Sequence, residues 1–318
     1  MDRLSSALSY TTIKPGSADD LFICCASFEE RSSAVAWNLF DYKTCATFMF
    51  SFTETDRRGL RQHQRDLIRE KMVSRSGMFF DVRCDLGDPV TGVTQFLDLC
   101  KTNGIGLTNQ AISLDITTFT KQYLLVLLKM LDMIHSGNQI RILYAYPAEY
   151  SPRKLTEGSR EIRSVPLWGG QLRQDKQTLL ILFLGFERDR AIGVWERYEP
   201  QETIAVIGSP AYHEGWERRA AKLNRDVFDL MGVRGAKLSA RDPVDVYQGL
   251  ENLCKDKWSE FNICIAPFGT KMQTVGIYMF AKDHPDVQLV YSVPQRYFEG
   301  YYSKGVGGFQ EFRLWEGR

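Results

Sequence analysis

Apolar runs alternate with segments of helical spacing along the whole chain. In the first half, the β-rich runs lie at 21–27, 46–52, 79–84, 111–116 and 140–146. Helical segments separate these runs, and strands that alternate with helices predict βαβ units and a parallel, doubly wound sheet. Asp88-Pro89 and Asp242-Pro243 predict two helix starts, because Asp is a common N-cap and Pro fits the first turn.

The second half of the chain repeats the first in the same order. The segment "LFICCASFEERSSAVAWNLF" (21–40) matches "LLILFLGFERDRAIGVWERY" (179–198), and "CDLGDPVTGVTQFLDLCK" (84–101) matches "LSARDPVDVYQGLENLCK" (238–255). Each segment of the first match carries a tryptophan, Trp37 or Trp195, which we expect in the core. The repeats predict an internal duplication. The alternative is two unrelated α/β domains with similar generic patterning.

The predicted fold class is therefore α/β, with two tandem Rossmann-like lobes at residues 15–170 and 176–318. Each lobe is expected to hold about six strands, five parallel and a sixth antiparallel at the edge, and the lobes are expected to be related by a pseudo-two-fold axis. No G-x-G-x-x-G follows either first strand, so the usual dinucleotide fingerprint is absent.

Composition narrows the class of protein. The 318 residues are 44% hydrophobic and 25% charged, and the net charge of +1 does not favour a nucleic-acid or membrane partner. The longest apolar run, 179–186, is too short to span a bilayer, and the first twenty residues lack a secretory signal. The seven cysteines are irregularly spaced and the four histidines lie far apart, so we expect a cytoplasmic protein with no metal ion and no cofactor.

Ligands of open α/β sheets bind at the carboxyl ends of strands where the strand order reverses, here between the first and fourth strands. The fourth-strand turn of lobe 2 holds Gly269, Thr270 and Lys271 at a helix start, which suits a phosphate. The fourth-strand turn of lobe 1 offers four comparable side chains: Thr117, Thr118, Thr120 and Lys121. The alternative is ordinary N-capping by the threonines, with solvated lysines.

The first-strand turns place carboxylates beside guanidiniums. Their candidate residues for sugar and base contacts are Ser27, Glu29, Arg31, Gly185, Glu187, Arg188 and Arg190. The structural alternative is that the acidic groups favour the helix start and the arginines pair with them. Two arginine-bearing segments, 54–71 and 213–226, have helical spacing. They are interpreted as solvated helix faces, with an RNA, DNA or protein surface as the alternative.

The stretch "APFGTKMQTVGIYMFAKDHPDVQLVYSVP" (266–294) resembles the fourth-strand signature of the CRISPR-associated Rossmann-fold (CARF) sensor domains. Its sharpest motif is Gly269, Thr270, Lys271 and Met272, and lobe 1 departs from it with Phe119. Two such lobes in one chain are similar to the SAVED domains of anti-phage signalling systems. The resemblance implies a cyclic oligonucleotide bound across the paired turns.

The leading hypothesis is a sensor of a nucleotide second messenger that signals to a partner effector in anti-phage defence. Thr120, Lys121, Gly269, Thr270 and Lys271 would bind its phosphates between the lobes. One alternative is an enzyme, a ring-nuclease-like phosphodiesterase or a glycosidic-bond hydrolase acting on nucleotides, with Glu29, Glu187 or Lys271 in the reaction. The other is a non-catalytic assembly subunit that binds protein or nucleic acid.

Overall fold

The computed structural model describes residues 8–10, 19–39, 41–54, 58–134, 137–230 and 233–315. The chain divides into two compact units. Unit 1 is made of residues 1–151 and 299–318, and unit 2 of residues 152–298. Residues 15–18 of the predicted first lobe lie outside the described ranges. None of the helices in the described ranges combines the length and apolar character needed to cross a bilayer.

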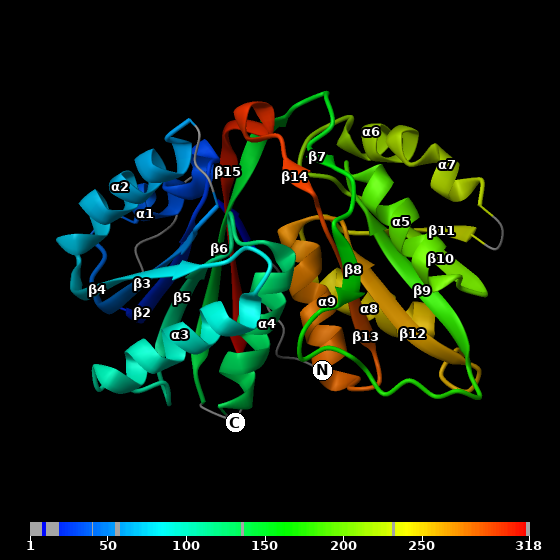
Figure 1. Ribbon diagram of the computed structural model, residues 1–318, viewed down its shortest axis with the longest axis horizontal. Helices are drawn as coiled ribbons and strands as arrows, with labels where there is room; N and C mark the ends of the chain where they lie inside the picture. Colours follow the sequence, from blue (N-terminus) through cyan, green and yellow to red (C-terminus); the bar gives the residue numbers. More distant parts are fainter. Residues whose placement is uncertain are drawn as a thin grey trace. The chain divides into compact units, whose positions relative to one another are not determined.

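Unit 1 contains a seven-stranded sheet in the order β1-β15-β6-β5-β2-β3-β4 (Figure 1). Its strands are β1 (Leu8–Tyr10), β2 (Asp19–Ala26), β3 (Thr44–Phe52), β4 (Ser76–Cys84), β5 (Ala111–Asp115), β6 (Gln139–Tyr150) and β15 (Ser303–Trp315). Its helices are η1 (Glu30–Ser32), α1 (Ala34–Asn38), α2 (Leu60–Val73), α3 (Pro89–Thr102), α4 (Lys121–Met133) and η2 (Glu299–Tyr301). Strands β2 to β6 are parallel, and β15 pairs with β6 in the antiparallel direction.

Unit 2 contains a six-stranded sheet in the order β11-β10-β9-β12-β13-β8. The strands of unit 2 are β7 (Thr156–Glu157), β8 (Glu161–Ser164), β9 (Gln177–Leu184), β10 (Glu202–Gly208), β11 (Val233–Leu238), β12 (Phe261–Pro267), β13 (Gln288–Val293) and β14 (Arg296–Tyr297). Of these, β7 and β14 pair with each other in a separate two-stranded sheet. Its helices are α5 (Arg188–Tyr198), α6 (Trp216–Leu223), α7 (Arg225–Phe228), α8 (Pro243–Cys254) and α9 (Lys271–Asp283). Strands β9 to β13 are parallel, and β8 is antiparallel to β13.

Both sheets confirm the predicted fold class of two mostly parallel, Rossmann-like α/β lobes. In each, the first strand lies between the second and fourth, as a doubly wound sheet requires. The repeats suggest that each antiparallel sixth strand pairs in the lobe that it ends, but in the structure each one pairs in the other unit. Strand β8 follows unit 1 in the sequence but pairs in unit 2, and β15 follows unit 2 but pairs in unit 1. The compact units therefore have other bounds than the predicted lobes 15–170 and 176–318, which stay a prediction about the duplicated sequence.

Alternation along the strands explains why helices cover both faces of the sheet in unit 1. Phe22 of β2 and Met49 of β3 lie in one apolar cluster with residues of α1 and α2. The neighbouring residue Phe50 points to the other face, where its ring contacts Phe96 of α3 and Tyr123 of α4. Successive strand residues face opposite sides, so both faces of these β-rich runs are apolar and both are buried.

The predicted helix starts are confirmed. A side-chain oxygen of Asp88 accepts a hydrogen bond from Thr91 N–H at the start of α3, and Asp242 accepts one from Val244 N–H at the start of α8. The expectation for one tryptophan was wrong. Trp37 is 37% exposed, and the Lys71 ammonium lies 3.6 Å from its ring centroid. The ring is covered by a cation rather than by the core.

Candidate functional site

The first-strand and fourth-strand turns lie together in each unit, as the strand order predicts. In unit 1, the Thr118 hydroxyl donates to the Cys25 carbonyl at the end of β2 and lies 3.0 Å from the Ser32 hydroxyl. In unit 2, a Cβ added to Gly185 would lie 2.4 Å from the Phe268 carbonyl oxygen. Glycine at 185 therefore allows the two turns to approach, since any side chain would collide with backbone.

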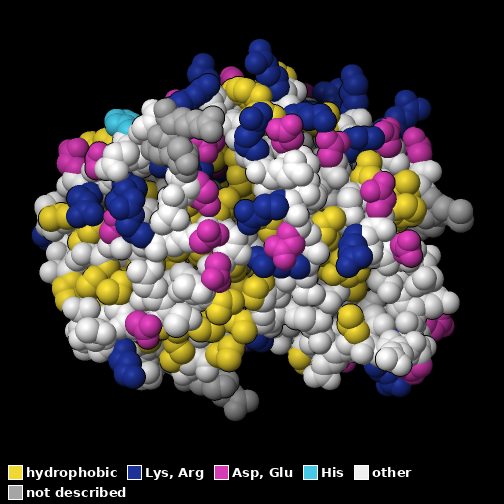
Figure 2. Space-filling view, viewed as in Figure 1, with side chains coloured by type: hydrophobic (Ala, Val, Ile, Leu, Met, Phe, Trp, Pro, Cys, Tyr) yellow, Lys and Arg dark blue, Asp and Glu magenta, His cyan; other side chains and the backbone are white. Residues whose placement is uncertain are grey.

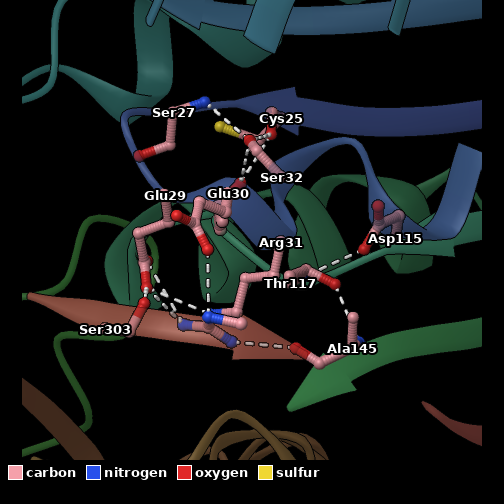
Figure 3. Close-up of polar contacts among 12 residues, drawn as sticks. Cys25, Ser27, Glu29, Glu30, Arg31, Ser32, Asp115, Thr117, Ala145 and Ser303 are labelled. Carbon is pink, nitrogen blue, oxygen red and sulfur yellow. Dashed lines mark hydrogen bonds and ion pairs between the residues drawn. The ribbon is translucent and has the colours of Figure 1, made fainter. Parts of the chain in front are cut away.

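The first-strand turn of unit 1 is organised around the buried Arg31 (Figure 3). The Arg31 guanidinium pairs with the Glu29 carboxylate at 2.9 Å and donates to the Ala145 carbonyl at 2.9 Å. The Ser303 hydroxyl also donates to Glu29, at 2.5 Å. Ser27 is buried, and its N–H donates to the Ser32 hydroxyl. These side chains fix the turn, which is the structural alternative that the sequence left open.

The first-strand turn of unit 2 has a similar buried arginine. Arg190 pairs with the Glu187 carboxylate at 2.8 Å and donates to the Ser292 carbonyl. Arg188 differs from it, because its side chain is 36% exposed and pairs with the carboxylates of Asp189 and Asp226. The predicted residues of this turn are thus of two kinds: a buried pair that holds the turn, and an exposed guanidinium.

Burial and ion pairing have opposite effects on the pKa of Arg31 and Arg190. Burial is the largest single influence and lowers the pKa of Arg31, but the Glu29 carboxylate together with Tyr150 and Tyr144 outweighs it, and the pKa lies above the ordinary value. Burial likewise lowers the pKa of Arg190, and Glu187 together with Tyr291 and Tyr297 raises it above the ordinary value. Both guanidiniums therefore stay charged, and each buried charge has its counter-ion beside it.

The fourth-strand turn of unit 1 is held by its threonines. The Thr117 hydroxyl accepts a hydrogen bond from Ala145 N–H at 2.9 Å, and Thr118 contacts the first-strand turn. Thr120 is the N-cap of α4 and accepts from Tyr123 N–H. Lys121 is the first residue of α4 and is half-buried. Phe119, which stands where unit 2 has glycine, is fully buried and packs on Phe50.

The fourth-strand turn of unit 2 forms a capping box. Thr270 accepts from Gln273 N–H, and the Gln273 side chain accepts from Thr270 N–H at 2.9 Å. The Thr270 hydroxyl donates to the Ala240 carbonyl at 2.6 Å. A Cβ on Gly269 would lie 2.0 Å from Gln273 Oε1, so the glycine makes room for this cap. Lys271 begins α9 and is half-buried. The pattern Thr-x-x-Gln was the missed signal for Gln273.

A pocket of about 190 Å³ lies beside the first-strand turn of unit 2. Its lining residues are Pro152, Arg153, Lys154, Leu155, Thr156, Phe186, Glu187, Arg188, Asp189 and Leu223. The Lys154 ammonium pairs with the Asp189 carboxylate at 2.6 Å. The hydrogen bond from Lys154 lowers the pKa of Asp189. Sequence reasoning missed Arg153 and Lys154, because they lie outside the repeated motifs.

Several arginines of the segments 54–71 and 213–226 form ion pairs or ring contacts within their own unit. Arg61 of α2 pairs with Glu299 at 2.5 Å, and Arg65 pairs with Asp81. Arg219 of α6 lies over the Phe186 ring at 4.2 Å from its centroid. Figure 2 shows Lys and Arg side chains interspersed with Asp and Glu side chains on the face in view. These contacts favour the interpretation as helix faces over that as a nucleic-acid surface.

Comparisons with solved structures give an informative similarity in fold. No protein-family model matches the chain, and no curated protein matches it. A solved structure of a Type III CRISPR defence DNA nuclease activated by cyclic oligoadenylate is similar, with a TM-score of 0.57 and 8% identity. The match covers 91% of this chain and 68% of that chain. This similarity supports the two-lobed, Rossmann-like fold that the sequence predicts.

A second solved structure, the cytoplasmic domain of a prokaryotic cation chloride cotransporter, has a TM-score of 0.28 and 8% identity. The match covers 89% of this chain and 99% of that chain. A TM-score this low does not indicate a shared fold.

Proposed function

We propose that the protein senses a cyclic oligonucleotide and passes the signal to a partner effector in anti-phage defence. The observation that carries the proposal is the recurrence, in each unit, of a Thr-capped helix that begins with lysine at the carboxyl edge of a parallel sheet. Thr120 and Lys121 occupy this place in α4, and Thr270 and Lys271 in α9. The similarity in fold to a nuclease activated by cyclic oligoadenylate supports the class of ligand.

Elementary electrostatics favour phosphate at these turns. The N-terminus of a helix carries a partial positive charge and favours an anion, and a lysine at the first position adds a full charge. Charge-assisted hydrogen bonds of this kind contribute about 1.5–3 kcal/mol each. Two such turns in one chain suit a ligand with several phosphates.

The residues of the first-strand turns receive different roles in this proposal. Glu29, Arg31, Glu187 and Arg190 are paired within their units, so we assign them to holding the turns in place. Direct contacts with sugar or base by these residues stay a prediction. Arg188 is exposed and is assigned to the ligand.

Calorimetric titration with a panel of cyclic oligoadenylates tests the proposal. Lys121→Ala and Lys271→Ala are expected to weaken binding at least tenfold each, since each removes a charged partner of a phosphate. Lys129→Ala in α4 and Lys282→Ala near the end of α9 are matched controls that remove a charge from the same helices. If neither Lys121→Ala nor Lys271→Ala weakens tight binding, the proposed site is wrong. If none of these ligands binds, the proposed function is wrong.

The enzyme alternative is tested in the same samples. Its candidate carboxylates, Glu29 and Glu187, are held in ion pairs with arginines, and no specific observation favours a reaction. Mass spectrometry of the ligand after incubation separates binding from cleavage.

A further inference from the structure

Two tyrosines recur with the same spacing at the fifth parallel strand of each unit. Tyr144 and Tyr150 lie in β6, while Tyr291 lies in β13 and Tyr297 in β14, and both pairs have the pattern Tyr-x-x-Pro-x-x-Tyr. We call Tyr144 and Tyr291 the inner tyrosines, and Tyr150 and Tyr297 the outer tyrosines. The inner tyrosines are buried and the outer ones are half-buried.

In unit 1, these tyrosines extend the ion pair of the first-strand turn. The Arg31 guanidinium, which pairs with Glu29, lies 5.8 Å from the ring centroid of Tyr144. The Tyr144 hydroxyl accepts a hydrogen bond from the guanidinium and also hydrogen-bonds with the Tyr150 hydroxyl. Carboxylate, guanidinium and two hydroxyls thus follow one another in a continuous polar chain.

Unit 2 repeats this arrangement. Arg190 pairs with Glu187 at 2.8 Å, and its guanidinium lies 4.9 Å from the ring centroid of Tyr291. The Tyr291 hydroxyl hydrogen-bonds with the Arg190 guanidinium and with the Tyr297 hydroxyl. We name each set of four residues the arginine–tyrosine chain of its unit: Glu29, Arg31, Tyr144 and Tyr150 in unit 1, and Glu187, Arg190, Tyr291 and Tyr297 in unit 2.

Each arginine–tyrosine chain also contacts the fourth-strand turn of its unit. In unit 1, Ala145 accepts a hydrogen bond from Arg31 with its carbonyl and donates one to the Thr117 hydroxyl with its N–H (Figure 3). In unit 2, the Arg190 guanidinium lies 5.2 Å from the ring centroid of Phe268 in that turn. A displacement of either fourth-strand turn therefore acts on the arginine of the chain.

In unit 2, the other end of the chain lies where the main chain crosses between the units. The main chain leaves unit 1 after residue 151 and leaves unit 2 after Phe298. Tyr297 pairs with Thr156 across the sheet of β7 and β14, and the Phe298 N–H donates to the Leu155 carbonyl at 3.0 Å. A ribbon of two residue pairs is not stable by itself, so its order depends on contacts such as those of Tyr297.

The outer tyrosine of unit 1 has a similar place. Tyr150 is the last residue of β6 and pairs with Ser303 of β15, and the Ser151 N–H donates to the Tyr302 carbonyl at 3.2 Å. In each unit, the two stretches of main chain that cross to the other unit are therefore hydrogen-bonded to each other beside an outer tyrosine.

We propose that the arginine–tyrosine chain of each unit couples the order of the first-strand and fourth-strand turns to the order of the main chain where it crosses between the units. A buried guanidinium keeps its partners at a high cost in free energy if they are lost, so a shift of the turn moves the tyrosines with it. The inference rests on the proposed function, since it states how a ligand at the same turns is signalled to the rest of the protein.

Hydrogen–deuterium exchange with mass spectrometry on the full chain tests the coupling without ligand. Tyr297→Phe removes the outer hydroxyl and keeps the ring. We expect amide exchange to become at least about threefold faster in the segments 155–157 and 296–298, and also in the first-strand turn at 185–190. A hydroxyl that only supports the ribbon would leave the turn unchanged.

Tyr247→Phe is the matched control. Its hydroxyl donates to Asp283 at 2.9 Å in the same unit, so the variant removes a comparable hydrogen bond outside the arginine–tyrosine chain. We expect no faster exchange in 185–190 or 296–298. Tyr150→Phe is the second variant, expected to act on the turn at 27–32 and on 302–303 in unit 1. Circular dichroism checks that each variant is folded.

The cyclic oligoadenylate panel tests the coupling with ligand. In the unsubstituted protein, binding is expected to slow exchange at least about threefold in 155–157 and 296–298. Tyr297→Phe should bind within about threefold of the original affinity in calorimetry, yet lose most of this protection. Binding as weak as that of Lys271→Ala would place Tyr297 in the ligand site and overturn the coupling.

Failure of this inference and failure of the proposed function give different results. A cyclic oligoadenylate that binds without changing exchange at the crossings keeps the function and removes the coupling, as does a Tyr297→Phe variant that exchanges like Tyr247→Phe. If no cyclic oligonucleotide binds, the function is wrong, and the ligand-free comparison still decides the coupling. Faster exchange at 185–190 in Tyr297→Phe then supports it, and unchanged exchange there overturns it.

Discussion

Arg31 and Arg190 make the same contact in the two units. Each guanidinium donates to the carbonyl of the residue that follows a buried tyrosine in the fifth parallel strand, Ala145 after Tyr144 and Ser292 after Tyr291. Each also pairs with a glutamate of its own turn. The arginine thus links the first strand's turn to the fifth strand, across the end of the fourth.

Arg31→Met is expected to lower the free energy of unfolding by about 3–5 kcal/mol, because it leaves the Glu29 carboxylate buried without its partner. The double variant Glu29→Gln, Arg31→Met should lose less than Arg31→Met alone, since no unpaired charge stays buried. Urea denaturation followed by fluorescence measures both. Arg173→Met is the control, because Arg173 and Asp175 form an exposed ion pair, and exposed ion pairs contribute little to stability. Equal losses for Arg31→Met and Arg173→Met would contradict the role of the buried pair.

Gly185→Ala is expected to destabilise the protein by about 1–3 kcal/mol, as overpacking does in well-packed sites. The added methyl would lie 2.4 Å from the Phe268 carbonyl oxygen and force the two turns of unit 2 apart. Thermal unfolding measures the loss. Gly169→Ala is the matched control, because a Cβ there meets no atom within 4 Å. An unchanged melting temperature for Gly185→Ala would show that the turns do not need this approach.

Thr270→Ala is expected to cost about 1–2 kcal/mol, the upper part of the range for N-caps. It removes both the cap of α9 and the hydrogen bond to the Ala240 carbonyl. Gln273→Ala removes the other half of the capping box, so the two losses should add up to more than the loss in the double variant. Strictly additive losses in chemical denaturation would mean that the two side chains act independently.

Thiol labelling is expected to find one reactive cysteine in the native protein. All seven cysteines are free, and of these Cys45 is exposed while the other six are buried. Burial raises the pKa of Cys84, Cys100, Cys254 and Cys264 to about 12. At pH 8 only about one in ten thousand of such thiols is ionised, so they react slowly.

Ellman's reagent should therefore release about one equivalent of chromophore from the native protein and seven after denaturation. Cys45→Ser should abolish the native equivalent and leave the rest. Rapid native labelling of several thiols would mean that the strands bearing them are not packed as described.

The sequence by itself determined the features that depend on neighbours along the chain. Period-two and helical patterning predicted the strands and helices, Asp88 and Asp242 marked helix starts, and the strand order placed the first-strand and fourth-strand turns side by side. Each of these follows from backbone geometry and hydrogen bonding over a few residues, or from the rules by which parallel strands connect. The duplication itself stays a prediction from the repeats.

Only the tertiary structure decided which charged side chains are buried and which segment covers each turn. Glu29 meets Ser303, which lies 274 positions later in the chain, and Lys154 reaches Asp189 from a segment outside the repeats. A local pattern shows that a turn carries carboxylates and guanidiniums, but their pairing depends on distances of a few ångströms between segments remote in sequence. Strand β8 follows unit 1 in the sequence but pairs in unit 2, and β15 follows unit 2 but pairs in unit 1. This pairing brings the segments with Lys154 and Ser303 to their turns, and no periodicity in the sequence encodes the pairing.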